Sequence, residues 1–257
     1  MAEPDASAPF VEVCSRDQGY GAFRGFETST AHTVPCSEPG CVQITPAEEV
    51  ADAGCADSGA SCRAVVIRPE LVTTGSAANR ATQRLLDAGT SEFAELSDGC
   101  WLALFDYTIH YDAHDILDVS FRSSGQGAYP SANMSHVTID LQTGTRITAQ
   151  NAFRPARLPE LLTLLRSKVH AAWQRKALEI PEVFHDQEEP TITVEDVGHF
   201  VVQGTGIVFI YDFGFPHVIA AATPDNEYAL PKAALRRFIQ PDGPLAWMLE
   251  STRAPSK

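Results

Sequence analysis

The stretch that decides the fold is residues 116–153, which read ILDVSFRSSGQGAYPSANMSHVTIDLQTGTRITAQNAF. Apolar residues occupy every second position at its start, at Leu117, Val119 and Phe121. This alternation predicts a strand with one face on a core and the other face toward water. The stretch therefore begins as one element of a sheet.

Two further alternating runs follow, at residues 136–141 and 146–148. Between them, Thr143 and Gly144 predict a turn that joins paired strands. The whole stretch is therefore expected to form an antiparallel meander.

A glycine-rich segment, SSGQGAYPSANM at residues 123–134, is expected to be the one conspicuous loop of the meander. A binding role for this loop predicts these contact residues: Ser124, Gly125, Gln126, Gly127, Tyr129 and Pro130. The alternative is a bulged connection that needs glycine for positive φ. Both interpretations remain open from the sequence.

Length and composition bound the fold class. A chain of 257 residues with 44% hydrophobic residues can bury a substantial core in one large domain or two small ones. No apolar run approaches the roughly 20 residues that a membrane-spanning helix needs. We expect an α+β protein with antiparallel sheets, a long helix packed on one face, and two lobes.

The formal charge of −14, from 33 acidic and 19 basic residues, argues against nucleic acid as a partner. A phosphate-binding surface needs clustered Lys and Arg, whereas the basic pairs of this chain lie on predicted helices. The charge favours a cationic macromolecule as partner, or serves only to keep the protein in solution.

All six cysteines lie in the first 100 residues: Cys14, Cys36, Cys41, Cys55, Cys62 and Cys100. An even number in a loop-rich region predicts disulfides, an oxidising compartment and a stapled N-terminal lobe. Zinc is the competing interpretation, but the spacings lack the C-x2-C element of most structural zinc sites. Because short loops close easily, we expect the pairs 36–41 and 55–62, which leaves 14–100.

The compartment follows from the cysteines. Bacterial periplasm, an outer-surface lipoprotein and a secreted protein are the expected locations. The start, MAEPDASAPF, has no basic and apolar leader, so we expect a leader to have been removed and residues 1–9 to be a linker remnant.

Three helices are predicted, and the shortest is expected at residues 232–239, directly after Pro231. Residues 77–88 carry Ala78, Ala81 and Leu85 on one face, with Ser76 as N-cap and Gly89 as stop. Residues 158–173 are a stronger candidate, because large apolar residues recur at steps of three and four. That second helix is expected to lie across a sheet, and a hairpin is expected at residues 199–211.

Three residues form the best metal-like cluster, His110, Asp112 and His114. On a strand they would share one face, as ligands do. However, Asp-Ala-His-Asp at residues 112–115 is ordinary turn chemistry between two strands. We expect the turn, and therefore no metal and no cofactor.

Six short sequences occur in a characteristic order: ILDVSF, GAYP, VTIDLQTGTRIT, NAFRP, GIVFIYDF and ALPKAALRRF. Through these six sequences, residues 116–239 resemble a domain of unknown function. This is the extracytoplasmic domain of RsiV-type lysozyme-sensing anti-sigma factors. The same domain precedes the catalytic domain of PdaC-type peptidoglycan deacetylases. Residues 63–111 resemble the smaller domain that usually precedes it.

The resemblance implies a non-catalytic module. The Asp-Asp element of the deacetylase domain is absent from this sequence, and His217 stands where relatives carry an aromatic residue. The expected domains are a linker at 1–9, a smaller α+β domain at 10–104, the RsiV/PdaC-like domain at 105–240 and a tail at 241–257.

Two functions from different classes remain. The first is a non-enzymatic envelope or secreted binding module that recognises a cationic, lysozyme-like protein or a peptidoglycan fragment. The second is a hydrolase acting on a cell-wall or sugar substrate through scattered residues such as His136. No G-x-S-x-G, H-E-x-x-H or P-loop signature supports the second.

Overall fold

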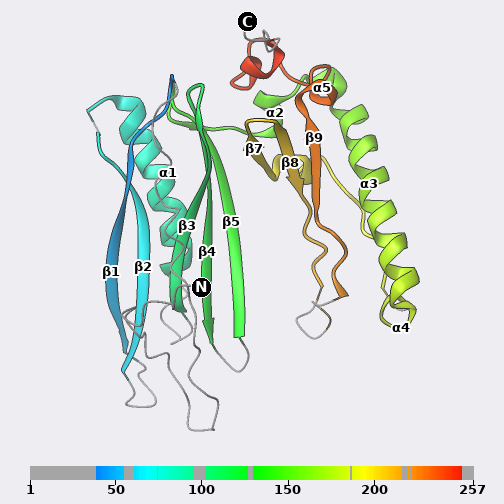
Figure 1. The fold of residues 1–257 in the computed structure, drawn as a ribbon, viewed down its shortest axis with the longest axis horizontal. Coiled ribbons are helices and arrows are strands. Elements are labelled where there is room, and N and C mark those ends of the chain that lie inside the picture. The colour runs from blue at the N-terminus through cyan, green and yellow to red at the C-terminus, as the bar shows by residue number, and fades with distance from the viewer. Residues whose placement is uncertain are drawn as a thin grey trace, which may run out of the picture. The chain divides into compact units, whose positions relative to one another are not determined.

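The computed structural model describes residues 39–54, 61–73, 75–94, 102–126, 130–185, 187–215, 219 and 222–250. Figure 1 shows these residues as a coloured ribbon. Within these ranges, no helix combines the length and apolar character that crossing a bilayer requires.

Six strands form one sheet in the order β1-β2-β3-β4-β5-β6. Their bounds are β1 Ile44–Gly54, β2 Ser61–Leu71, β3 Leu102–Ala113, β4 Ile116–Gln126, β5 Pro130–Asp140 and β6 Thr145–Arg146. β1 and β2 are antiparallel, whereas β2 and β3 are parallel. The helix α1 (Ala77–Ala94) lies between β2 and β3 in the chain, as a parallel pair requires. The expectation of antiparallel sheets alone was therefore wrong at this pair.

Three strands form a second, fully antiparallel sheet. They are β7 Phe200–Gln203, β8 Gly206–Ile210 and β9 Glu227–Pro231. Gly204 and Thr205 connect β7 to β8, so the predicted hairpin is confirmed. A Cβ on Gly206 would lie 2.2 Å from the carbonyl oxygen of Leu230, which explains why glycine begins β8 beside β9.

The remaining helices are α2 Ala149–Ala152, α3 Leu158–Glu179, α4 Pro181–Phe184 and α5 Lys232–Leu235. Short 3₁₀ turns occur at Pro155–Arg157, Asp196–Gly198 and Ala246–Leu249. The long helix of the prediction is α3, and the mixed α+β class is confirmed.

The chain divides into two compact units that alternate along the sequence. The first unit comprises Met1–Ser37, Val42–Ile109 and Val119–Val137, and the second comprises Glu38–Cys41, His110–Asp118 and Thr138–Lys257. Each unit takes segments from both halves of the chain. This division does not test the predicted N-terminal and C-terminal lobes, which stay a prediction.

In the first unit, α1 packs against β4 through a close approach at Gly89. A Cβ there would lie 2.4 Å from the Phe121 ring, and Phe121 stacks on Phe105 of β3 at 6.0 Å between ring centroids. The helix therefore continues through Gly89 to Ala94, and the predicted stop was wrong. Glycine serves packing here, since only a residue without a side chain lets the helix lie on the aromatic ring.

The buried face of α1 also differs from the prediction. Thr82, Leu86 and Thr90 are buried, whereas Ala78, Ala81 and Leu85 are only partly so. The predicted N-cap is confirmed, because the backbone N–H of Asn79 donates to Ser76 Oγ at 2.9 Å.

In the second unit, one face of α3 meets the residues of the three-stranded sheet in a common core. The buried residues of this helix are Leu161, Leu162, Leu165, Val169, Ala172 and Trp173. The three- and four-residue spacing predicted these six residues and also Leu158, which is only partly buried.

The end of the chain contributes to the same core. Leu245 and Met248 are buried, and Trp247 packs against the cluster. The segment expected to be a tail is therefore docked as far as Glu250, while the predicted helix at 232–239 is limited to α5.

The sequence of residues 35–61 predicts a disulfide-pinned insertion, and residues 63–67 predict a strand that Pro69 closes. Instead, residues 44–54 form β1 and pair with β2 along its whole length, with Pro46 opposite Pro69. Pro69 therefore does not close the strand. The two prolines face each other on neighbouring strands, and β1 is an edge strand, which is where sheets accept proline.

Candidate functional site

The predicted contact loop is shorter than the sequence suggested. β4 continues through residues 125–126 and β5 begins at Pro130, so Ser124 belongs to a strand and is only 7% exposed. Residues 127–129 lie outside the described ranges. The long loop was wrong because β4 lies between β3 and β5, and pairing on both edges holds a glycine-containing segment extended.

The three residues of the metal-like cluster do not share one strand face. His114 and Asp115 have φ of 56° and 61° and form a two-residue turn between β3 and β4. Positive φ at both positions is typical of the type I′ hairpin turn. Among the residues that the structure describes, no group of three or more His, Cys, Asp and Glu is placed to hold a metal ion.

The strand β4 was expected to show one face to water, but Asp118 is fully buried. Its carboxylate accepts hydrogen bonds from Thr138 Oγ1 at 2.8 Å and from the Val202 backbone N–H at 2.9 Å. Asp118 therefore connects β4 to β5 and to β7 as a structural residue.

An aromatic stack occupies the turn between β3 and β4. The ring of Trp247 lies nearly parallel to those of Tyr111 and His114, at centroid distances of 5.2 and 4.4 Å. The Tyr111 hydroxyl and His114 Nδ1 are 2.6 Å apart. Since the Tyr111 and His114 rings are only 6.2 Å apart, both lie on the same face of the indole.

A cation completes this stack. The Lys232 ammonium lies over the Trp247 ring at 4.2 Å from its centroid, and burial lowers the pKa of Lys232. With its indole ring covered by these side chains, Trp247 fixes the end of the chain. The arrangement positions the C-terminal segment and offers no open aromatic platform for a ligand.

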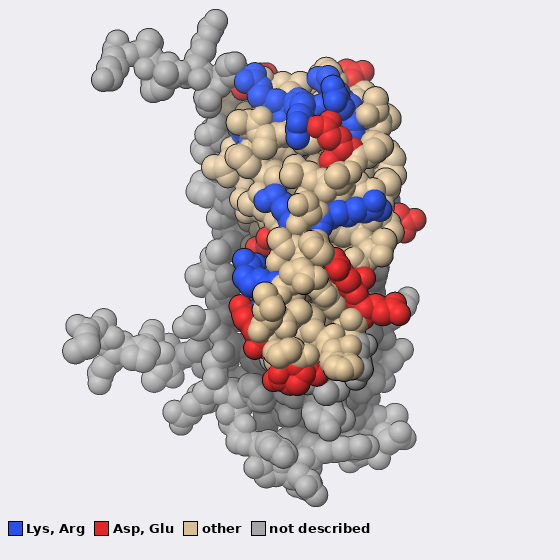
Figure 2. All heavy atoms as spheres, turned by 90° about the vertical axis from the view of Figure 1, so that its right-hand side faces the viewer, with Lys and Arg blue, Asp and Glu red and all other residues tan. Residues whose placement is uncertain are grey.

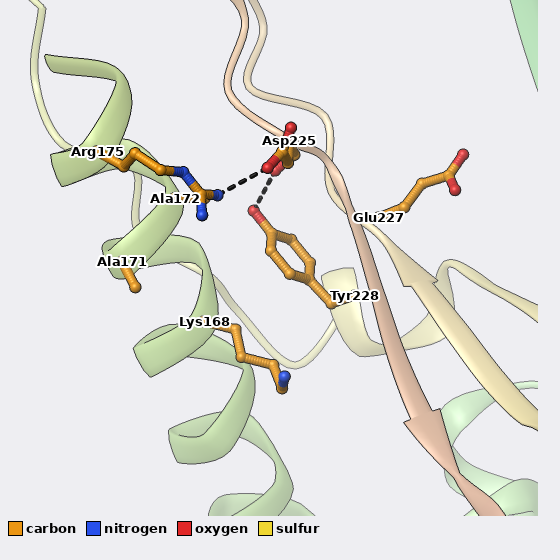
Figure 3. A pocket seen from close by; sticks show the side chains of 7 residues that line it. All are labelled: Lys168, Ala171, Ala172, Arg175, Asp225, Glu227 and Tyr228. Carbon is orange, nitrogen blue, oxygen red and sulfur yellow. Dashed lines mark hydrogen bonds and ion pairs between the residues drawn. The ribbon is translucent and has the colours of Figure 1, made fainter. Parts of the chain in front are cut away.

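The second unit also has a hollow between α3 and β9, drawn in Figure 3. Its volume is about 270 Å³. The lining residues are Lys168, Ala171, Ala172, Arg175, Asp225, Glu227 and Tyr228. No residue of this hollow was predicted as a site from the sequence.

Polar contacts hold the β9 side of the hollow. Arg175 Nη2 donates to the Asp225 carboxylate at 2.7 Å, and the Tyr228 hydroxyl donates to the Asp225 carbonyl oxygen at 2.6 Å. Burial, with a smaller contribution from Asp225, raises the pKa of Tyr228 to about 12. The phenol is therefore neutral at physiological pH.

Charge is strongly segregated along the second unit. Residues 154–176 and 228–240 contain six and three basic residues, nine in all, against one acidic residue, Glu160. Residues 177–227 contain ten acidic residues and no Lys or Arg. Figure 2 shows basic side chains over one end of the α3 face and acidic side chains at the other.

The arginines of this basic region make hydrogen bonds within the second unit. Glu160 accepts from both Arg157 and Arg237, at 2.9 and 2.8 Å. Arg154 donates to the Ile239 carbonyl oxygen and Arg236 to that of Leu249. These contacts join α3, α5 and the C-terminal segment, so much of this charge has a structural use.

Comparison with known proteins gives structural similarity only. No protein-family model and no curated protein sequence matches the chain. It is similar to the crystal structure of a DUF3298 family member from Bacteroides fragilis, with TM-score 0.49 and 12% identity over 84% of this chain and 100% of that one. It is also similar to a DUF3298 family protein from Pseudomonas aeruginosa PAO1, with TM-score 0.49 and 15% identity over 79% and 96% of the two chains.

DUF3298 denotes a domain of unknown function, so no residue role is taken from these structures. The resemblance to RsiV-type and PdaC-type domains stays a prediction.

Proposed function

We propose that the chain is a non-enzymatic binding module of the bacterial cell envelope, periplasmic, lipid-anchored or secreted, whose partner is a cationic, lysozyme-like protein. The observation that carries this proposal is the acidic segment at residues 177–227. A cell-wall component is the other partner class that the sequence suggested.

The carboxylates of this segment are available to a partner. Of its ten acidic residues, eight are exposed: Glu179, Glu182, Glu188, Glu189, Glu195, Asp212, Asp225 and Glu227. A field of one sign on an open surface raises the association rate of an oppositely charged protein, and salt weakens the effect.

Three of these residues form what we call the acidic end: Glu179, Glu182 and Asp212. Glu179 is the last residue of α3, and Glu182 lies in α4. Asp212 precedes Phe213, whose ring stacks on Trp173 of α3 at 6.1 Å between centroids. Glu179 and Glu182 therefore lie at the carboxyl-terminal end of α3, and Asp212 precedes a residue that packs on the same half of this helix.

Glu179 is unfavourable for α3 itself, because a carboxylate in the last turn of a helix repels its partial negative charge, at a cost of roughly 0.3–1 kcal/mol. Lys176 offsets part of this cost through its 3.1 Å ion pair with Glu179. Glu182 lies in the first turn of α4, where a carboxylate is favourable.

Calorimetric titration with a C-type lysozyme, at low and at high salt, tests the proposal. We expect binding that weakens with salt, and a loss of about tenfold in affinity when the acidic end is neutralised as Glu179→Gln, Glu182→Gln and Asp212→Asn. The matched control neutralises three exposed carboxylates elsewhere, as Glu48→Gln, Glu70→Gln and Asp242→Asn, and is expected to change affinity less than about twofold. No binding at either salt concentration would rule out a lysozyme-like partner.

The hairpin connection is tested separately. The predicted contact residues Gly127 and Tyr129 lie outside the described residues, between β4 and β5 in the sequence. We expect Tyr129→Ala and Gly127→Trp to weaken lysozyme binding. If affinity is unchanged in both, the loop is not the contact, and the acidic end remains the candidate.

The oxidising location rests on the cysteines. Cys14, Cys36, Cys55 and Cys100 lie outside the described residues. Cys62 lies opposite Ala53 in the β1–β2 pairing, and Cys55 lies outside the described residues, so the 55–62 disulfide stays a prediction. Non-reducing peptide mapping checks it, and six free thiols in the purified protein would contradict export.

A further inference from the structure

The hollow between α3 and β9 is built around a stripe on the helix. Lys168, Ala171, Ala172 and Arg175 stand at positions i, i+3, i+4 and i+7, which share one helix face. Two alanines between two long cationic residues leave space beside the helix that larger side chains would fill. The stripe therefore combines room for a ligand with positive charge at both ends.

Lys168 is the basic residue of this hollow that lacks a partner among the described residues. It is half-buried, and its ammonium makes no hydrogen bond or ion pair with any residue that the structure describes. An anionic ligand would supply the partner that this ammonium lacks among the described residues.

Arg175 is available at the other end. Its ion pair with Asp225 is exposed, with 61% and 77% of the two side chains accessible, so the pair contributes about 0–1 kcal/mol. The hydrogen bond to Asp225 uses only Nη2, and a guanidinium has five N–H donors. A second carboxylate can therefore join Arg175 without displacing Asp225.

The β9 side supplies a neutral wall. The Tyr228 ring lies between the two cations in Figure 3, and its hydroxyl points toward Asp225. The Glu227 carboxylate points away from Lys168 in the same view. No negative charge therefore opposes an anion at the Lys168 end.

The spacing of the cations defines the ligand. Seven residues of α-helix span about 10.5 Å along the axis. A peptide in the polyproline II conformation turns once every three residues and rises about 3.1 Å per residue, so carboxylates three residues apart share one face and lie about 9 Å from each other. We propose that the hollow binds a short extended peptide with two carboxylates three residues apart, one on Lys168 and one on Arg175.

This site goes beyond the proposed function, because it takes a small anionic peptide rather than a cationic protein. The hollow also differs in residues from the acidic end. Failure of lysozyme binding therefore leaves this proposal intact, and the reverse also holds.

The test is an NMR titration of the full chain with acetyl-Asp-Ala-Ala-Asp-amide at low ionic strength. The uncharged control is acetyl-Asn-Ala-Ala-Asn-amide. We expect saturable shifts at Ala171, Arg175 and Tyr228 with the first peptide and none with the second. Equal binding of both peptides, or no binding of either, would overturn the proposal.

Variants identify the residues. Lys168→Gln and Arg175→Gln are each expected to weaken binding about tenfold or more, and Ala171→Leu, at an exposed position, is expected to fill the hollow and abolish it. Lys176→Gln is the matched control, because it removes the same charge from the same helix outside the hollow, and it should change affinity less than about twofold. If Ala171→Leu fails to fold, the two Gln variants decide the question. A loss with Lys176→Gln equal to that with Lys168→Gln would contradict the site.

Discussion

α1 and α3 each bury one face, but the two faces have opposite character. α3 buries four large aliphatic residues, an alanine and a tryptophan. The described part of the α1 face buries Leu86 between two threonines, Thr82 and Thr90. The hydrophobic effect therefore accounts for the position of α3 directly, whereas α1 depends on the shape of its partner strand.

Gly89 shows how the shape of the partner strand β4 positions α1. The closest approach of α1 to β4 occurs where the helix has no side chain at all. A glycine inside a helix is unfavourable by about 1 kcal/mol relative to alanine when exposed. Its presence here shows that packing on Phe121 outweighs helix propensity.

The largest expected effect separates the two faces of α3. Leu165→Ala should lower the free energy of unfolding by about 2–5 kcal/mol, because the side chain is buried and the cavity refills only in part. Leu178→Ala is the control on the same helix, since Leu178 is 83% exposed, and it should stay within about 0.5 kcal/mol. Urea unfolding followed by circular dichroism measures both. Equal losses would mean that burial does not position α3.

A smaller effect tests the close approach in α1. Gly89→Ala should destabilise the first unit by about 1–3 kcal/mol, because a Cβ would overlap the Phe121 ring. Thermal unfolding of Gly89→Ala, Phe121→Leu and the double variant forms the measurement. The penalty should shrink in the Phe121→Leu background. A stabilisation of about 1 kcal/mol by Gly89→Ala alone would show that propensity prevails instead.

The threonines of α1 provide a test with the opposite sign. The Thr82 hydroxyl is buried and has no hydrogen-bond partner among the described residues, whereas Thr90 Oγ1 donates to the Leu86 carbonyl oxygen at 3.0 Å. Thr82→Val should therefore raise stability by up to about 1 kcal/mol. Thr90→Val, which loses a hydrogen bond, should not. Chemical denaturation distinguishes them, and a destabilised Thr82→Val would reveal a partner for that hydroxyl.

The smallest effect appears only in alkali and occurs in both units. Burial is the main cause that raises the pKa of Tyr107 and of Tyr228 from 10.0 to about 12. Because the folded-state pKa is the higher one, this stability is present below pH 10 and is lost as pH rises from 10 to 12. Tyr228→Phe should flatten the decline of the second unit in that window, while the loss of the hydrogen bond to the Asp225 carbonyl oxygen lowers stability at neutral pH by about 0.5–1.5 kcal/mol. A decline with unchanged slope would mean that Tyr228 does not titrate there.

Sequence reasoning succeeded where one segment carries its own pattern. The α3 stripe, the Ser76 cap and the hairpin at Gly204 follow from local spacing and turn chemistry. It failed where a neighbour decides. Strand pairing extends β4 through Gly125, and packing on Phe121 carries α1 through Gly89.

The candidate sites show the same division. The acidic run at residues 177–227 can be counted in the sequence, although only its exposure makes it a surface. The stripe of Lys168 and Arg175 also has a sequence signal, in the i and i+7 spacing of two cations around two alanines. The spacing of these residues does not predict that β9 lies opposite the stripe and leaves a hollow beside it.

By itself, the sequence determined the α+β class, the long helix and the overall negative charge, because periodicity and composition act within single segments. Only the tertiary structure decided the strand order, with its parallel β2–β3 pair, and the stacking of Trp247 on Tyr111 and His114. It also decided the hollow beside α3. These features depend on contacts between residues far apart in the chain, for which no local pattern exists.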